Sequence, residues 1–160
     1  MSIAAIVDSA NDVAARATAW LATPLLLAFR GYVAWQFLKS GWLKLSDWDS
    51  TLYLFQDEYH VPVLPPALAA VAGTAGEIVF PLLLIAGLGT RFAALGLSAV
   101  NVMAVVSYAH VLLGEGFEAA LGQHYLWGTM LLVVLVFGPG RWSLDAWPKP
   151  ATGPRRRPPL

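Results

Sequence analysis

The sequence predicts an all-α integral membrane protein, a four-transmembrane-helix bundle with a short N-terminal interfacial helix and both termini cytoplasmic. Composition gives the first reason, because 58% of the 160 residues are hydrophobic and only 12% are charged, whereas a soluble domain carries roughly a quarter charged residues. The second reason is that four apolar stretches are each long enough to cross about 30 Å of hydrocarbon. The third is an uneven placement of basic residues along a chain of net charge +0.

The chain divides into three segments. Residues 1–19 are predicted to lie at the membrane interface, because acidic residues come before the first basic one and the segment lacks the basic start of a secretory signal. Residues 20–145 are predicted to form the membrane domain. After the helix-ending "GPGRWSLD", residues 146–160 are predicted to be a disordered basic cytoplasmic tail. The expected spans are residues 20–45, 65–88, 91–113 and 121–137. The short "GLGTR" between the second and third spans predicts a tight antiparallel hairpin.

Basic residues near the ends of these spans predict the orientation. One side holds most of them: Arg16, Arg91, Arg141, Lys149 and the arginines at 155–157. The other side holds chiefly Lys44, with Asp47, Asp49, Asp57, Glu58, Glu115 and Glu118. Because cytoplasmic loops carry the excess of Lys and Arg, the first side and both termini are expected in the cytoplasm.

Three polar residues inside the expected spans reach similar depths when the helical rise is counted from the span ends. Arg30 and Glu77 differ by about one helical turn, and Asn101 reaches the level of Glu77. A lone charge at the bilayer centre costs about 2.5–3.5 kcal/mol, so opposite charges at one depth are expected to meet. The sequence therefore predicts a buried Arg30/Glu77 polar site with Asn101 beside it. Two interpretations stay open: a structural ion pair, or a catalytic site that binds a ligand or moves a proton.

All three histidines are expected toward the outer side. His110 and His124 come from adjacent spans and are candidate ligands for a metal or a haem iron, although their spacing matches no compact metal motif. The alternative is hydrogen bonding to loops or lipid head groups. In "QHYLWG", His124, Tyr125 and Trp127 combine a proton-accepting ring with aromatic faces at the depth of a quinone headgroup, and Tyr108 lies near the same outer end. We interpret this group, together with Asn101, as a candidate quinone site, with an aromatic interface belt as the simpler alternative.

Three stretches, "FLKSGWLKL", "GEIVFPLLLIAGLGTRFAAL" and "GPGRWSLD", occur in an order and spacing that resemble the DoxX family of small four-helix bacterial membrane proteins. The resemblance covers about residues 24–145. It implies a multi-pass protein of the bacterial inner membrane. The family takes its name from a quinone-linked oxidoreductase that oxidises thiosulfate, and other members are membrane partners of oxidative-stress, thiol or metal-handling proteins. The matching positions are Arg30, Gly41, Lys44, Glu77, Gly87, Arg91 and residues 138–145, and the resemblance does not say which of them are catalytic. "YHVPVLPP" and "HYLWG" are similar to a subset that we associate with operons for copper-chelating peptides.

Three functions follow from these observations. The first is an accessory subunit of a quinone-linked oxidoreductase, in which Glu77 or His124 exchanges a proton with the quinone and Arg30 holds the carboxylate. The second is a non-catalytic anchor or assembly partner for a copper or oxidative-stress response system. The third, ranked last, is a small-solute permease. The sequence does not decide whether the protein is itself an enzyme.

The expected partners follow from the same interpretation. The chain has no cysteine, so a thiol relay or an iron–sulfur cluster held by this chain alone is excluded, and a quinone is the one cofactor expected. The partners expected are the lipid bilayer, membrane or periplasmic proteins, and a second copy of the chain in a homo-oligomer. No nucleic-acid partner is expected.

Overall fold

The computed structural model describes residues 2–147, and every regular element in this range is helical. The four long helices are α1 (Ile3–Ser46), α3 (Pro66–Ala86), α4 (Thr90–Ser107) and α6 (Glu118–Phe137). The short elements are α2 (Trp48–Tyr53), the π-helical turn η1 (Leu54–Glu58), α5 (Ala109–Leu112) and the 3-10 turn η2 (Leu144–Ala146). The prediction of an all-α protein is confirmed.

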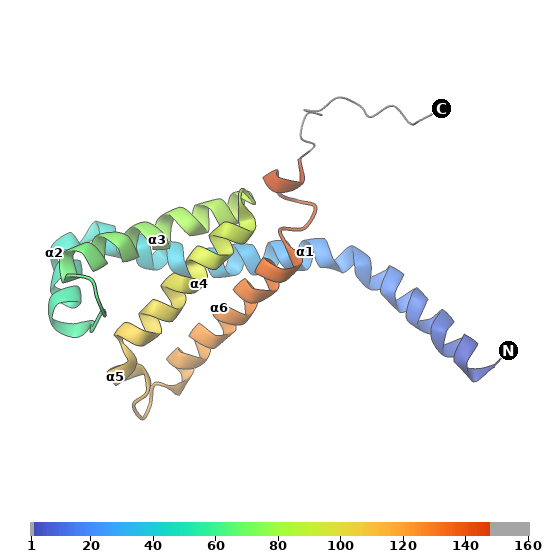
Figure 1. Cartoon of the computed structure of the whole chain (residues 1–160), viewed down its shortest axis with the longest axis horizontal. Coiled ribbons are helices and arrows are strands. Elements are labelled where there is room, and N and C mark those ends of the chain that lie inside the picture. The colour runs from blue at the N-terminus through green and yellow to red at the C-terminus, as the bar shows by residue number, and fades with distance from the viewer. Residues whose placement is uncertain (1, 148–160) are drawn as a thin grey trace.

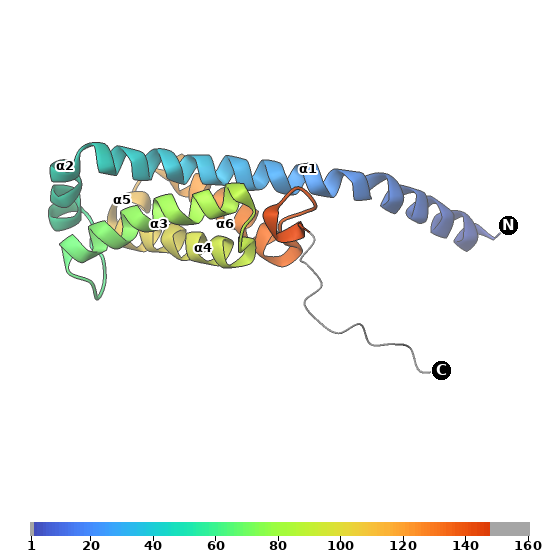
Figure 2. The same ribbon diagram turned by 90° about the horizontal axis from the view of Figure 1, so that it is seen from above.

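The long helices pack into one bundle. Helix α1 contacts α3 and α6, and α4 contacts the same two helices, so the four form a closed ring. Figures 1 and 2 show α1 running along the whole bundle, with α3, α4 and α6 beside it. The core inside the ring is apolar and consists of Leu26, Val33, Ala34, Phe37, Leu84, Ala93, Ala94, Leu97, Leu131 and Val134.

Three of the described helices, α3, α4 and α6, are long and apolar enough to cross a membrane. Their outward side chains are apolar as well; for example, Val79 is 51% exposed and Leu132 is 58% exposed. Such an exterior suits lipid rather than water. A multi-pass membrane protein in contact with the bilayer is therefore supported. Helix α1 carries Arg30 and Lys39 among its apolar residues and is not one of the three, so the fourth span stays a prediction.

Helix α1 differs from the prediction at its start. Residues 1–19 were expected to be a separate interfacial helix, but α1 runs unbroken from Ile3 to Ser46. The Ser2 hydroxyl accepts a hydrogen bond from the Ala5 amide and caps the helix. Pro24 lies inside the helix without ending it. Figure 1 shows the N-terminal part of α1 leaving the bundle at an angle. Its position at the membrane interface stays a prediction.

The predicted hairpin between the second and third spans is present. Helix α3 ends at Ala86, and the capping residue Gly87 has a left-handed φ of 69° that a residue with a side chain rarely adopts. The Leu88 amide donates to the Leu83 carbonyl at 3.0 Å, which is the bond of a Schellman C-cap. A Cβ at Gly87 would lie 2.5 Å from the Ser143 Cβ. The chain therefore needs glycine here both for the turn and for the close approach of the C-terminal segment.

The C-terminal segment caps the start of α4. The two carboxylate oxygens of Asp145 accept hydrogen bonds from the Gly89 and Thr90 amides, each at 2.8 Å. A carboxylate at a helix N-terminus satisfies free amides and complements the helix dipole. The end of "GPGRWSLD" thus ties the chain back onto the α3–α4 turn.

One boundary at the outer end differs from the prediction. The third span was expected to continue from 91 to 113, but α4 ends at Ser107 and the separate turn α5 follows. Tyr108, with φ −115° and ψ 21°, makes the break. At the other end, the predicted disordered tail lies outside the described residues from position 148 onward.

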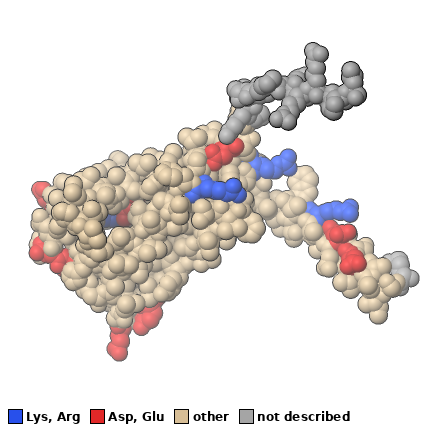
Figure 3. Space-filling model, in the orientation of Figure 1, with Lys and Arg blue, Asp and Glu red and all other residues tan. Residues whose placement is uncertain are grey.

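Charged side chains gather at the two ends of the bundle. In Figure 3, red acidic groups lie at the end that carries α2 and α5, the blue basic groups lie toward the opposite end beside further red groups, and a mainly tan belt separates the two ends. This distribution is what the positive-inside rule requires of a protein with its α3–α4 turn in the cytoplasm. The orientation itself stays a prediction.

Candidate functional site

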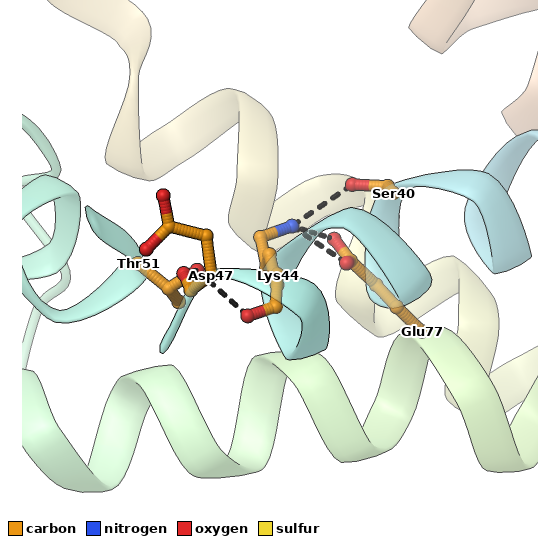
Figure 4. A network of polar contacts seen from close by, with 5 residues as sticks. All are labelled: Ser40, Lys44, Asp47, Thr51 and Glu77. Carbon is orange, nitrogen blue, oxygen red and sulfur yellow. Dashed lines mark hydrogen bonds and ion pairs between the residues drawn. The ribbon is translucent and has the colours of Figure 1, made fainter. Parts of the chain in front are cut away.

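An ion pair lies inside the bundle between α1 and α3 (Figure 4). The Lys44 Nζ is 2.6 Å from both carboxylate oxygens of Glu77 and donates at 2.9 Å to the Ser40 hydroxyl. The two charged side chains are only 14% and 9% exposed. A lysine has three donors and no acceptor, so all three bonds run in the direction its chemistry requires.

A glycine sets the register of this pair. A Cβ at Gly41 would lie 3.1 Å from the Glu77 Cβ and 2.8 Å from Ile78 Cγ1, so α1 and α3 are in close contact at this level. Ser40 and Lys44, four residues apart, lie on one face of α1. The glycine allows the close approach, and Lys44 then reaches the carboxylate.

The predicted contact between Arg30 and Glu77 is therefore wrong. Arg30 lies 14 residues before Lys44, about 21 Å away along a straight helix. The prediction counted depth from positions 45 and 65 as if the two span ends were level. In the structure α2 and η1 occupy the connection, and the helices align so that Glu77 meets Lys44 instead.

Arg30 has a different role in the structure. Its side chain, 1% exposed, donates from Nε to the Leu84 carbonyl at 2.8 Å and from Nη2 to the Ile85 carbonyl at 3.0 Å. Its Nη1 donates to the carbonyls of Pro139 and Trp142. A cation at the C-terminal end of α3 satisfies carbonyls that lack partners within the helix. Arg30 thus joins α1, α3 and the C-terminal segment, away from Glu77.

Asn101 and His124 form a second polar pair. The Asn101 amide nitrogen donates to the His124 carbonyl at 3.0 Å, and the Asn101 Oδ1 lies 2.8 Å from His124 Nδ1. Because a carbonyl only accepts, the first bond fixes which end of the amide is nitrogen. The Oδ1 must then accept from Nδ1–H. The neutral imidazole consequently carries its lone pair on Nε2.

A cavity of about 550 Å³ joins the two polar pairs. Its walls come from α1, η1, the 59–64 loop and helices α3 to α6. The polar lining residues are Gln36, Ser40, Lys44, Tyr59, Glu77, Ser107, Tyr108 and His124. Aromatic walls are supplied by Phe37, Phe55, Phe80 and Trp127. A mainly apolar cavity with a few convergent polar groups is the usual form of a small-molecule site.

Two buried polar atoms on cavity-lining residues have no hydrogen-bond partner within residues 2–147. They are the indole Nε1 of Trp127 and the hydroxyl of Ser107. A buried polar group without a partner costs free energy, and a bound ligand is one way to satisfy it. The Trp127 ring packs edge-on against Phe37 and His124, which holds it in place. Both atoms are themselves enclosed by neighbouring atoms, so a ligand reaches them only after the surrounding side chains shift.

The cavity brings together some of the predicted site residues and not others. Glu77, Tyr108, His124 and Trp127 line it. Arg30, Asn101, Tyr125 and His110 do not line it. Sequence reasoning missed Ser40 and placed Lys44 near the water. Their spacing of four residues around Gly41, in "SGWLK", is the signal that would have found both.

The metal prediction gains no support. Residues 2–147 contain no group of three or more His, Asp or Glu side chains able to hold a metal ion. His110 instead stacks on His60 with ring centroids 4.4 Å apart, while His124 bonds to Asn101. The two predicted ligands thus have different neighbours.

Tyr59 lies in the loop at the outer end of the cavity. Burial raises the pKa of its phenol, and the negative charge of Glu77 raises it further. The ring packs edge-on against Phe55 and Tyr108. Tyr59 therefore keeps its proton and offers the cavity an O–H donor.

These features define an all-helical membrane protein with an internal amphipathic cavity. The family model described as DoxX matches residues 25–110, and the chain belongs to the DoxX family. A Haemophilus influenzae (strain ATCC 51907 / DSM 11121 / KW20 / Rd) protein, described as uncharacterized, is 29% identical over 127 residues, which cover 75% of this chain and 80% of that protein. No solved structure matches the chain.

Proposed function

We propose that this DoxX protein binds a membrane quinone in its cavity and acts as a membrane subunit of a redox system. The aromatic cavity of about 550 Å³, whose wall holds the Lys44–Glu77 pair, is the observation that carries the proposal. A quinone ring presents two flat apolar faces and two carbonyl oxygens. Phe37, Phe80 and the indole ring of Trp127 match the faces, while the ammonium group of Lys44 matches an oxygen.

Each polar group has a definite part in this proposal. Lys44 Nζ already uses its three donors on Glu77 and Ser40, so it donates to a quinone oxygen in place of its bond to Ser40. Glu77, held by the ammonium group, is the carboxylate that takes up or returns a proton. His124 Nε2 carries the lone pair needed to accept a proton from a quinol hydroxyl. A bound quinone would accept two electrons from a partner redox protein and take up two protons, and the reverse reaction would return those electrons to the partner and one proton each to Glu77 and His124.

The proposal also includes the arrangement in the membrane. Residues 20–45 of α1 pack along α3 and α6, so we place them as a fourth span in the bacterial inner membrane. The basic end of the bundle then faces the cytoplasm. The Lys44–Glu77 pair lies toward the outer half, where a partner on the periplasmic side comes closest.

The test is the quinone content of the full chain purified from its own membrane, measured by extraction and chromatography. Lys44→Met should lower the quinone per chain by about tenfold, because one charged donor is worth about 1.4 kcal/mol or more. Lys39→Met is the matched control. Lys39 is exposed on another face of α1 and does not line the cavity, so its variant should keep the wild-type content. Equal losses in both variants, or wild-type protein free of quinone, would contradict the proposal.

A non-catalytic anchor or assembly partner, for example in a copper or stress-response system, is the second candidate function. One observation favours it: the N-terminal part of α1 exposes Ile3, Val13 and Trp20 outside the bundle, a surface that a partner can cover. Removing residues 2–16 should then lower the yield of the native complex and leave quinone content per chain unchanged. If quinone is lost while the complex persists, this candidate is wrong.

A further inference from the structure

The geometry points to a lateral portal: the cavity opens sideways between α3 and α4 into the lipid, and its ligand is a bilayer-dissolved amphipathic molecule with an oxygen-bearing head and an apolar chain. The inference deepens the proposed function and rests on it for the chemistry of the head. The portal is named here by three lining residues, Ala72 on α3 and Ala99 and Met103 on α4.

All three portal residues are both cavity-lining and exposed. Their helices are two of the three described helices able to cross a membrane. An exposed residue in the middle of such a helix faces lipid, so the cavity wall and the lipid-facing surface meet at these positions. Ala72 and Ala99 carry only a methyl group, which leaves room between the helices.

The two helices touch closely up to their middle and separate toward the outer end. A Cβ at Gly96 would lie 2.4 Å from the Phe80 ring, and a Cβ at Gly76 would lie 2.8 Å from Val100. Farther from the α3–α4 turn, Figure 1 shows α3 and α4 diverging. The portal residues Ala72 and Met103 lie on this diverging side.

The interior charge is visible through the same side of the molecule. In Figure 3 a small blue and red patch appears in a recess of the tan surface, in the area between α3 and α4 of Figure 1. Lys44 and Glu77 form the ion pair that lines the cavity. A head group entering from the lipid therefore reaches a charged pair, while an apolar chain behind it remains against Ala99 and Met103.

A thiol-labelling experiment tests the route and needs no quinone. The chain has no cysteine of its own, so only an introduced cysteine supplies a thiol. Ser40→Cys places one thiol on the cavity wall with little change in shape. The full chain in proteoliposomes is treated with lipid-soluble N-phenylmaleimide or with a membrane-impermeant trimethylammonium methanethiosulfonate. We expect the lipid-soluble reagent to react readily and the charged reagent to react slowly.

A bulky side chain at the portal should close it. Adding Ala72→Phe to Ser40→Cys should lower the rate at which N-phenylmaleimide labels the thiol by about tenfold. Ala75→Phe is the matched control, since Ala75 is exposed on the same helix but does not line the cavity; its rate should stay within about twofold of the parent. Equal rates for both phenylalanine variants, or a charged reagent as fast as the lipid-soluble one, would overturn the portal.

The ligand class is tested by protection of the same thiol. A benzoquinone with a decyl chain should protect Ser40→Cys against labelling at a concentration at least about tenfold lower than the same ring without a chain. Equal protection by both compounds would overturn the apolar-chain part of the inference. If the Ala72→Phe result holds and neither quinone protects, the portal stands and the proposed quinone function fails.

Discussion

Lys44 Nζ is 2.6 Å from both carboxylate oxygens of Glu77, and this contact joins α1 to α3 at the wall of the cavity. Both charged groups are largely shielded from solvent, so each one offsets the desolvation cost of the other. A ligand that bonds to one of them consequently changes the environment of both. The pair connects the stability of the bundle with the chemistry that the cavity can perform.

Glu77→Gln should destabilise the bundle, because it leaves the Lys44 ammonium without its anion in a low-dielectric interior. Loss of one partner of a buried pair costs about 3 kcal/mol. Lys44→Met in the same chain should recover most of that loss, since it removes the unpaired charge. Chemical denaturation in detergent of the two single variants and the double variant measures this coupling. Additive effects of the two substitutions would contradict the pairing.

Arg30→Lys should lower stability without changing the cavity. Lysine cannot reproduce the planar fork that contacts carbonyls on two segments, so we expect a loss of about 2–3 kcal/mol from the missing charged hydrogen bonds. Arg91→Lys is a useful control, because Arg91 donates to two carbonyls, of Leu135 and Val136, in an exposed setting and should cost less than about 1 kcal/mol. Quinone content per folded chain should be unaltered by Arg30→Lys. Loss of quinone without loss of folded protein would show that Arg30 contributes to the binding site.

The tautomer of His124 can be observed directly. The bonds with Asn101 require the proton on Nδ1, so nitrogen-15 NMR of histidine-labelled protein at alkaline pH should show one imidazole locked as the Nδ1–H form. Asn101→Leu removes the acceptor and should release this ring to the more common mixture. His110→Gln is the control and should leave the signal in place, because His110 stacks on His60 and not on the Asn101–His124 pair. An Nε2–H ring at His124 would show that the amide is assigned the wrong way round.

Tyr59 gives a prediction of pH dependence. Its folded-state pKa is raised above the ordinary value of about 10, so the folded state holds a proton that the unfolded state has lost. The stabilisation from this phenol is fully present below pH about 10 and is lost as pH rises through the folded-state pKa. Ultraviolet titration should show one tyrosine that ionises at a higher pH than the others. This component should disappear in Tyr59→Phe and remain in Tyr53→Phe. A late component that survives Tyr59→Phe would contradict the assignment.

Much of the fold follows from local properties of the sequence. Neighbouring residues determine the lengths of the apolar stretches, the glycine turn at Gly87 and the helix stop after Phe137. The boundaries of α3, α4 and α6 accordingly agree with the predicted spans to within a few residues, apart from the outer end of the third span. The continuity of α1 was harder to predict from the sequence. Nothing before Pro24 breaks a helix, and a proline inside a helix can bend it without ending it.

The candidate site was predicted in part because its residues are polar in an apolar setting, which marks Glu77, Asn101 and His124 without any structure. Their partners were not predicted, because pairing depends on the register between helices. That register is set by contacts such as Gly41 against Glu77, and by a helical connection that shifts one span relative to the next. Counting depth along separate helices cannot supply it.

The central claim is that the Lys44–Glu77 cavity holds a quinone. Native mass spectrometry of the full chain from its own membrane tests it most directly, by the mass of any molecule retained on the protein. We expect a peak that carries one quinone in the wild type and in Lys39→Met, and the loss of this peak in Lys44→Met. Wild-type protein that carries no such mass, under conditions in which bound lipid survives, would contradict it.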